Sequence, residues 1–375
     1  MHQSVIRRIM RSLLLLLLAQ VIQLPASATA LLTRRPSADD GYAIFEHPGK
    51  MVRLRGGNRL SMYCIGEGRP TVILETGFGG GAYADYHKLE PLVGRFTRVC
   101  SYDRAGYGFS ELGHDLPRDL RHDVLDLHDL LKASGEPAPY ILVGHSDGGH
   151  IIGAYSDLYP KQLAGLVFLD AAVLLDKKQL ANAPAAIPAA EQAFFNQQLT
   201  QIRGCLARTE KASGLLTPRA GDYCLSPEDL KGLPPAMRQA VIEQLSRPDS
   251  WRAWLSEAEQ HYDNPSDRWE ESLLPHRWRH LPIRVFIASI PPLSDAEASV
   301  VFGIPAADRK ALAEARAGRR EWENLQARIC EFSEDCRTFR IPTMKHEVQN
   351  AVPQQVAAQI EGLVEQWRRA RDPQA

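Results

Sequence analysis

Continuous apolar runs of strand length recur along the chain, each bounded by glycine, proline or polar residues. They predict buried strands at 71–75, 98–102, 140–144, 163–169, 283–289 and 337–341. Elsewhere the apolar positions return every three or four residues, which predicts amphipathic helices at 117–134, 148–159 and 353–369. Two further short strands, 51–55 and 59–64, flank Gly56-Gly57-Asn58 and are typical of a β-hairpin. Strands that alternate with helices predict an α/β fold, with a mostly parallel sheet covered on both faces.

The alternation stops between residues 171 and 280. Strand patterns end there, Ala, Gln, Leu and Glu dominate, and four of the six tryptophans follow: Trp251, Trp254, Trp269 and Trp278. An α-helical insert between two strands of a sheet fits a lid over a pocket. Its tryptophans either line an acyl-binding surface or pack in the interior of the insert. The predicted division is a core of residues 50–170 and 281–375 with a helical lid at 171–280.

The first thirty residues carry a targeting pattern. Three arginines precede a leucine run at 13–18, and a small-residue series at 26–30 follows. A basic start, a short apolar middle and an A-x-A site predict a secretory signal peptide at 1–30, cleaved after Ala30. An uncleaved anchor is the alternative, but the apolar run is shorter than the ~20 residues that a membrane span needs. We therefore expect export to the periplasm or the medium, with a polar linker at 31–49.

Composition and charge add limits on partners. Hydrophobic residues make up 44% and charged residues 24% of the chain, which are ordinary values for a globular protein. The formal net charge of −1 provides no attraction to a nucleic-acid backbone, so no nucleic-acid partner is expected. His122 and Asp126 stand four residues apart on the polar face of one helix, but a solvated face explains them, and we expect no metal site.

The six cysteines form an even set in a chain that is expected to be exported. Three disulfides fit that number, and the lack of a paired C-x-x-C pattern argues against zinc. Cys330 with Cys336 and Cys205 with Cys224 are each close in sequence and are the pairs we expect. Buried free thiols are the alternative.

A serine in a strand–turn–helix context is the strongest chemical signal. The apolar run at 140–143 leads into Gly-His-Ser-Asp-Gly at 144–148, and a helical pattern follows. Small glycines on both sides of Ser146 let the strand and the helix close around a strained turn that exposes the hydroxyl. The next peptide N–H, that of Asp147, then lies at a helix N-terminus, where it can hold a developing oxyanion.

A glycine-rich loop, 76–81, follows the strand at 71–75. It lacks the Gly-Lys-Ser/Thr ending of a nucleotide-binding loop. A flexible backbone that brings a second N–H to an oxyanion explains it better.

Together, these elements resemble the α/β-hydrolase superfamily over about residues 50–170 and 281–370. The segment Asp-Arg-Ala-Gly-Tyr-Gly-Phe-Ser at 103–110 resembles the family's D-x-x-G-x-G-x-S turn, and His346 follows the last strand, where the family carries its catalytic histidine. The resemblance implies that Ser146 is the nucleophile and His346 its base. It also implies an oxyanion hole formed by the N–H groups of Phe78 and Asp147.

One departure from the family concerns the oxyanion loop. Thr76 stands where the family usually has the histidine of a His-Gly pair. The donor is a backbone N–H, so the loss need not abolish activity, but the hydrogen bonding around the loop must differ. His145 points away from the nucleophile in the family's elbow, which favours a structural role. The family's sheet order also makes the strands of Cys64 and Cys100 neighbours, and a third disulfide there depends on their register.

The resemblance leaves two candidates for the carboxylate of the triad. Relatives most often carry it after the strand that follows the lid, where Asp295 lies; others carry it after the strand that follows the nucleophile helix, where Asp170 lies. Two prolines disturb the spacing before Asp295, and Glu297 competes beside it. Asp170 needs no unusual loop, because the carboxyl end of a central strand already opens toward the site. We favour Asp170.

A Ser, acid, His order with a serine nucleophile indicates acyl transfer. The expected reaction is hydrolysis of a small-molecule carboxylic ester through an acyl-enzyme, without a cofactor. A peptidase or a lactonase on the same fold is the alternative. A binding protein of this fold would have lost the triad, and this chain keeps every part of it.

Overall fold

The computed structural model describes residues 41–113, 116–173, 189–263, 269, 272–274, 276–302 and 304–371. The expected signal peptide and the first part of the expected linker, residues 31–40, lie outside them. A single eight-stranded sheet has the order β1-β2-β4-β3-β5-β6-β7-β8. Its strands are β1 (Lys50–Arg53), β2 (Arg59–Ile65), β3 (Thr71–Glu75), β4 (Val99–Tyr102), β5 (Tyr140–His145), β6 (Leu163–Leu169), β7 (Ile283–Ser289) and β8 (Cys336–Pro342).

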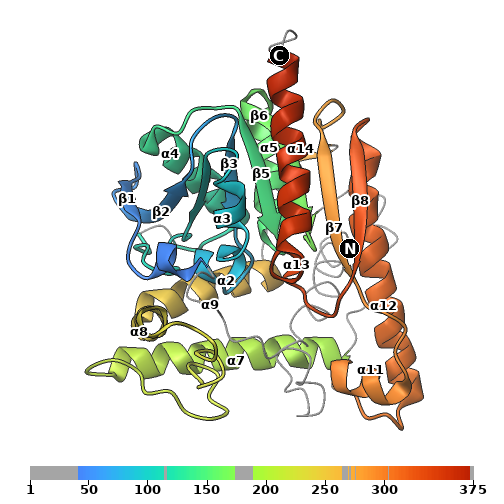
Figure 1. The fold of residues 1–375 in the computed structure, drawn as a ribbon. Coiled ribbons are helices and arrows are strands. Elements are labelled where there is room, and N and C mark those ends of the chain that lie inside the picture. Colours follow the sequence, from blue (N-terminus) through green and yellow to red (C-terminus); the bar gives the residue numbers. More distant parts are fainter. Residues whose placement is uncertain are drawn as a thin grey trace.

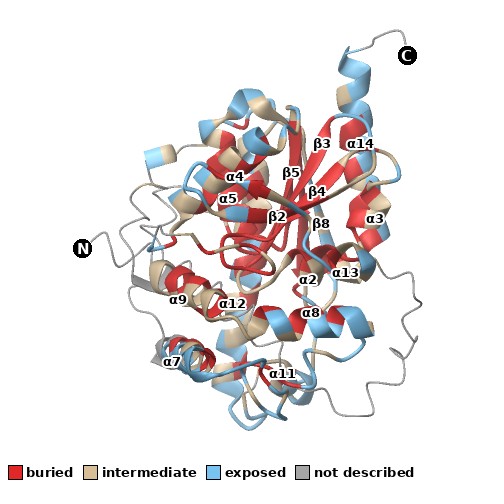
Figure 2. Ribbon diagram, turned by 90° about the vertical axis from the view of Figure 1, so that its left-hand side faces the viewer, coloured by how far each residue is buried: buried red, intermediate tan, exposed pale blue. Residues whose placement is uncertain are grey.

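The sheet is parallel from β4 through β8, and only the hairpin at its edge departs from this. There β2 runs antiparallel to both β1 and β4. The central strands β3, β5 and β6 are buried along nearly their whole length, as their continuous apolar runs predict. Figure 2 shows β3 and β5 in the colour of buried residues. The predicted mostly parallel α/β sheet is therefore confirmed.

Helices cover both faces of the sheet and create two apolar cores. On one face, α4 (Leu120–Ser134) and α5 (Gly148–Leu158) pack against the sheet, and on the other α3 (Glu90–Val93) and α14 (Pro353–Arg371) do so (Figure 1). The remaining core helices are α2 (Ala82–Tyr86), α11 (Asp295–Phe302), α12 (Arg309–Ala327) and α13 (Val348–Ala351), with 3-10 turns η3 (Tyr42–Phe45), η4 (Pro160–Gln162) and η5 (Arg328–Phe332).

A separate helical layer lies beyond the carboxyl ends of the parallel strands (Figure 1). We call residues 189–263 the helical insertion; it holds α7 (Ala189–Lys211), α8 (Pro235–Leu245) and α9 (Pro248–Asp263). It has an apolar core of its own, in which Trp251 is buried. Trp278 instead packs in the core of the sheet domain, which is the packing alternative for this tryptophan. No helix in the described part of the chain has the length and apolar character needed to cross a bilayer.

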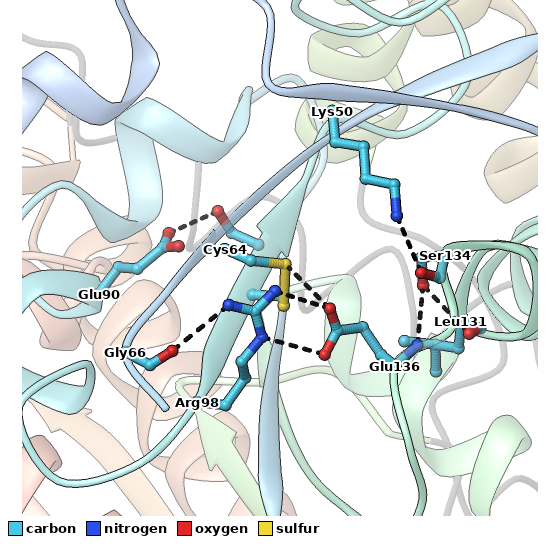
Figure 3. Close-up of a disulfide and its surroundings, with 10 residues drawn as sticks. Lys50, Cys64, Gly66, Glu90, Arg98, Leu131, Ser134 and Glu136 are labelled. Carbon is cyan, nitrogen blue, oxygen red and sulfur yellow. Dashed lines mark hydrogen bonds and ion pairs between the residues drawn. A yellow bond between two sulfur atoms is a disulfide. The ribbon is translucent and has the colours of Figure 1, made fainter. Parts of the chain in front are cut away.

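Three disulfides use all six cysteines. They are Cys64–Cys100, Cys205–Cys224 and Cys330–Cys336, the pairs expected from the sequence. The register of β2 on β4 sets Cys64 directly opposite Cys100, which is the condition that this pair required. Figure 3 shows the ion pair of Arg98 with Glu136 beside this disulfide, 2.8 Å between Nη2 and Oε1. The sulfurs and Glu136 lie close enough to resemble a metal-ligand group, but a disulfide offers no thiolate.

Candidate active site

Ser146 occupies the sharp turn between β5 and α5. Its φ of 51° is a left-handed conformation that a residue with a Cβ adopts only at a cost. The glycines beside it permit this turn, since a Cβ on Gly144 would lie 2.6 Å from the carbonyl oxygen of Gly148. The turn is tied to its neighbour by the N–H of Ser146, which donates to the carbonyl of Leu169 at 3.1 Å. The strand–elbow–helix context is thus present around Ser146.

Asp170 occupies a second strained turn, at the carboxyl end of the adjacent strand β6. Its φ is 42°, a region that aspartate tolerates better than most residues. Its N–H donates to the carbonyl of Phe286 at 2.7 Å, and the N–H of Ala172 donates to the carbonyl of Ser146 at 2.8 Å. These backbone hydrogen bonds hold the two turns side by side at the carboxyl ends of β5 and β6.

His346, in the loop after β8, lies at the carboxyl ends of the same strands, next to Asp170. Its Nδ1 lies 2.7 Å from Oδ2 of Asp170, and both side chains are buried. A histidine that donates Nδ1–H to a carboxylate presents Nε2 as the basic atom. Burial and the positive charge of His145 lower the pKa of His346, against the opposing pull of Asp170.

Four further donors surround the Asp170 carboxylate, which is fully buried. Oδ1 accepts from the Ala288 N–H at 3.1 Å, from Gln326 at 2.8 Å and from the Trp322 indole at 3.3 Å. Arg319 lies 3.4 Å from Oδ2. Burial alone would favour the neutral acid, but Arg319 and His346 hold the pKa of Asp170 well below its usual range. The group is therefore an anion that is fixed in one orientation.

Asp295, the alternative acid, lies elsewhere. It begins α11, so the segment predicted as a loop continues into a helix at this residue. Its carboxylate pairs with Arg316 at 2.9 Å and more distantly with Arg309. The adjacent Glu297 accepts hydrogen bonds from Ser294 within the same turn. Of the acids the sequence left open, the structure brings Asp170 to His346.

The loop after β3 approaches the serine closely. A Cβ on Gly77 would lie only 3.0 Å from the Cβ of Ser146, so any side chain at this position would crowd the serine. Phe78, the next residue, packs near Trp254 of the helical insertion, with 6.3 Å between the ring centroids. On the other side of Ser146, Asp147 stands at the N-terminus of α5. The loop and the helix end thus flank the serine from two directions.

Arg104 fixes that loop from below, which the sequence did not reveal. This arginine belongs to the 103–110 motif and is almost fully buried. Nη1 donates to the Thr76 carbonyl at 2.7 Å, and Nη2 donates to the Gly77 carbonyl at 3.2 Å. Its charge is balanced by Glu75 on β3 and by Glu257 on α9, at 3.2 and 3.0 Å. One guanidinium thereby joins the glycine-rich loop at 76–81, which we call the oxyanion loop after its expected role, to the helical insertion.

Asp85 on α2 is a second residue that sequence reasoning missed. Its Oδ2 accepts from the Gly77 N–H at 2.9 Å and lies 3.0 Å from Nδ1 of His145. The ring of His145 is 4.5 Å from that of His346, centroid to centroid. No sequence motif surrounds Asp85, so the sequence alone does not indicate its contacts with Gly77 and His145.

A cavity of about 600 Å³ lies between the oxyanion loop and the helical insertion. Phe78 and Tyr107 line it from the core, and Trp251 and Trp254 line it from α9. Amide and carboxylate side chains complete the wall: Gln197, Gln198, Gln201, Asp222, Glu228, Asp229 and Gln244. Its size is that of a small-molecule site.

Comparison with known proteins identifies the family to which this fold belongs. The family model described as "Alpha/beta hydrolase family" matches residues 72–359. The chain therefore belongs to the α/β hydrolase family, which confirms the resemblance seen in its motifs.

Individual relatives share parts of the chain. An uncharacterized protein of Bacillus subtilis, YbdG, is 32% identical over 131 residues, which are 34% of this chain and 39% of that protein. The 2-hydroxy-6-oxo-2,4-heptadienoate hydrolase of Pseudomonas putida is 32% identical over 124 residues, 33% of this chain and 44% of that one. The matches thus span less than half of either relative.

A solved structure matches over a longer range. The meta-cleavage product hydrolase of Pseudomonas fluorescens aligns with a TM-score of 0.52 at 16% identity, over 85% of this chain and 98% of that one. At this identity the likeness shows the fold.

Proposed function

We propose that this protein is an exported serine hydrolase that cleaves a carboxylic ester through an acyl-enzyme. The observation that carries the proposal is the 2.7 Å contact between Asp170 and His346, next to the strained turn of Ser146. Nucleophile (Ser146), orienting acid (Asp170) and base (His346) then follow one another in the chain order of the α/β hydrolases. Membership of a hydrolase family supports an enzyme. That the substrate is a carboxylic ester is our proposal, made because the expected nucleophile is a serine.

The first half of the reaction forms the acyl-enzyme. His346 Nε2 takes the proton of Ser146 Oγ while Oγ bonds to the ester carbonyl carbon. The carbonyl oxygen becomes an oxyanion held by the N–H groups of Phe78 and Asp147. The carbon–oxygen bond to the alcohol then breaks, and the imidazolium gives its proton to the leaving alkoxide. Asp170 stabilises the imidazolium and remains ionised throughout.

The second half releases the acid. His346 removes a proton from water while the oxygen of that water bonds to the acyl carbon. This addition gives a second tetrahedral intermediate, whose oxyanion is held by the same N–H groups. The bond to Ser146 Oγ breaks, and the imidazolium returns the proton to the serine. The carboxylic acid leaves, and every step uses only water and groups of this chain. The cavity beside Phe78 is the proposed site for one side of the ester, and the helical insertion above it is the proposed lid.

The test is labelling by a fluorophosphonate probe together with hydrolysis of p-nitrophenyl esters of graded acyl length. Ser146 should be the labelled residue, and Ser146→Ala should lower turnover by ~10³-fold or more. A matched panel of peptide amides, lactones and a 2-hydroxy-6-oxo-dienoate covers the alternatives. Preference for an amide or a lactone would replace the ester, and full activity of Ser146→Ala would contradict the mechanism itself.

A further inference from the structure

Another Asp–His pair, Asp85 with His145, lies between the oxyanion loop and His346. Resting on the proposed function, we propose that Asp85 is a positioning residue that fixes the oxyanion loop. In the same proposal, His145, held by Asp85, keeps His346 in its basic form. The pair thus acts on both halves of the catalytic apparatus without touching the ester.

A single carboxylate oxygen makes the connection. Oδ2 of Asp85 is 2.9 Å from the Gly77 nitrogen and 3.0 Å from Nδ1 of His145. Gly77 precedes Phe78, whose N–H is the proposed oxyanion donor, and His145 precedes Ser146. The Asp85 carboxylate therefore binds the residue before Phe78 and the residue before Ser146. In this way it fixes the distance between the proposed oxyanion donor and the proposed nucleophile.

The loop needs such a support. A run of glycines has large backbone freedom, and an oxyanion donor is effective only if it is held in place before charge develops. In the family a histidine usually stands at the position of Thr76. Here Arg104 binds the carbonyls of Thr76 and Gly77 on one side of the loop. Asp85 binds the Gly77 N–H on the other, so together they fix the orientation of that peptide segment.

The surroundings of the pair favour the charged form of both side chains. Burial opposes ionisation of Asp85, but His145 and the Gly77 N–H lower the pKa of this carboxyl below its usual range. Burial also opposes protonation of His145, yet the Asp85 carboxylate outweighs it and raises the pKa of the imidazole. Both side chains are less than a tenth exposed, so solvent screens them little.

A protonated His145 lies against the base of the proposed triad. Besides His145, four charged groups interact electrostatically with His346, directly or through a neighbour. They are Asp170 after β6, Glu347 next to His346 in the chain, Asp85 on α2, and Arg319 on α12, which acts through Asp170. Burial lowers the pKa of His346, and the charge of His145 lowers it further, whereas Asp170 and Glu347 raise it. Like charges 4.5 Å apart between ring centroids disfavour a second imidazolium, which leaves His346 free to accept a proton at lower pH.

The first experiment separates this role from simple packing. In Asp85→Asn the amide cannot accept both hydrogen bonds as an anion, so kcat should fall by roughly 10- to 100-fold while KM stays within about 2-fold. Glu90→Gln is the matched control, because Glu90 is also buried and near in sequence but contacts Ser101. Its kcat should be unchanged. A kcat of Asp85→Asn equal to that of this control would overturn the positioning role.

The second experiment reads the charge of His145 and needs no catalysis. Histidine side-chain NMR titration of the wild type and of His145→Gln reports the pKa of His346 directly. Removal of the neighbouring positive charge should raise this pKa and shift the acid limb of kcat/KM to higher pH. An unchanged or lowered His346 pKa in the variant would overturn the proposal. If the wild type hydrolyses no ester, the proposed function fails, whereas the titration still decides whether His145 acts on His346.

Discussion

At the scale of single residues, the environment of Asp170 argues for its role as the triad acid. It receives hydrogen bonds from a backbone amide, an indole and a carboxamide, and His346 contacts its other oxygen. Such a carboxylate is held in one orientation and cannot readily accept a proton. It can therefore fix the tautomer of a histidine and stabilise its charged form.

Substitution of Asp170 by asparagine tests this role. An amide at this position can present N–H to His346 and favour the wrong tautomer, so kcat should fall by ~10⁴-fold with little change in fold. Asp295→Asn is the matched control and should keep full activity, because Asp295 pairs with Arg316 and Arg309 instead. Steady-state kinetics on the best p-nitrophenyl ester decides it. Collapse of the Asp295 variant alone would move the acid to α11.

The pH profile provides a second prediction at this scale. The base must be neutral to act, so activity rises with pH through the pKa of His346. Burial and His145 lower that pKa, which moves the rise to lower pH. The acid limb of kcat/KM should therefore have its midpoint below the ~6.5 of an ordinary histidine. A midpoint above that value would show that the charge of Asp170 dominates.

The sequence predicts some of these residues and not others for a physical reason. Ser146 and His346 each follow a predicted strand, at the places where the family resemblance implies a nucleophile and a histidine, so the sequence alone could propose them. The acid was reduced to two alternatives, since both lie after strands. Asp85 could not be predicted, because its role depends on a short helix folding back onto residues 60 positions away. Nothing in its neighbouring residues records that contact.

At the scale of elements, strand positions were the easiest part to predict. The segments predicted at 71–75, 163–169 and 283–289 are the observed β3, β6 and β7, because buried parallel strands are apolar without interruption. Residues 295–302 were harder. The prolines before them favour a loop, but Asp295 and Glu297 begin a helix that packs on α12. Tertiary packing decides such a segment, and its periodicity does not.

The edge hairpin provides a prediction about stability. The Cys64–Cys100 disulfide closes a 36-residue separation between β2 and β4, and replacing both cysteines with alanine should cost about 2–4 kcal/mol of unfolding free energy. The matched control removes Cys330–Cys336, whose separation is only 6 residues, and should cost less. Chemical denaturation of both variants tests the order. Equal losses would mean that loop length does not determine the contribution.

At the scale of the whole molecule, one buried ion cluster joins the sheet domain to the helical insertion. Arg104 pairs with Glu75 in the sheet and with Glu257 on α9, and the Tyr107 hydroxyl also donates to Glu257 at 2.6 Å. These groups are almost completely shielded from water. A buried charge that loses a partner is costly, so this contact should contribute strongly to the attachment of the insertion.

Glu257→Gln tests that contact. It leaves Arg104 undercompensated in the interior and should lower the unfolding free energy by about 3 kcal/mol. Glu259→Gln, on the same helix, is the control: Glu259 pairs with Arg203 at the surface, and its loss should cost no more than about 1 kcal/mol. Thermal and chemical unfolding measure both. Similar small losses would mean that the buried cluster is compensated in another way.

Export is the remaining prediction at this scale. The basic start, leucine run and A-x-A series predict that the secreted or periplasmic form begins at or near Leu31. Mass spectrometry of that fraction from a bacterial host identifies the first residue directly. Intact Met1 in exported material would contradict cleavage and favour the anchor.

The Arg104 cluster also limits how this enzyme can be rebuilt. A chimera would replace the helical insertion by that of a relative. Here a donor segment without an acid at the place of Glu257 would leave the Arg104 guanidinium at the Thr76 and Gly77 carbonyls without one of its two ion-pair partners, Glu75 being the other. A transplanted specificity would then come with a displaced oxyanion loop. A chimera of this chain should therefore either keep an acid at position 257 or exchange the helical insertion together with Arg104 and Glu75.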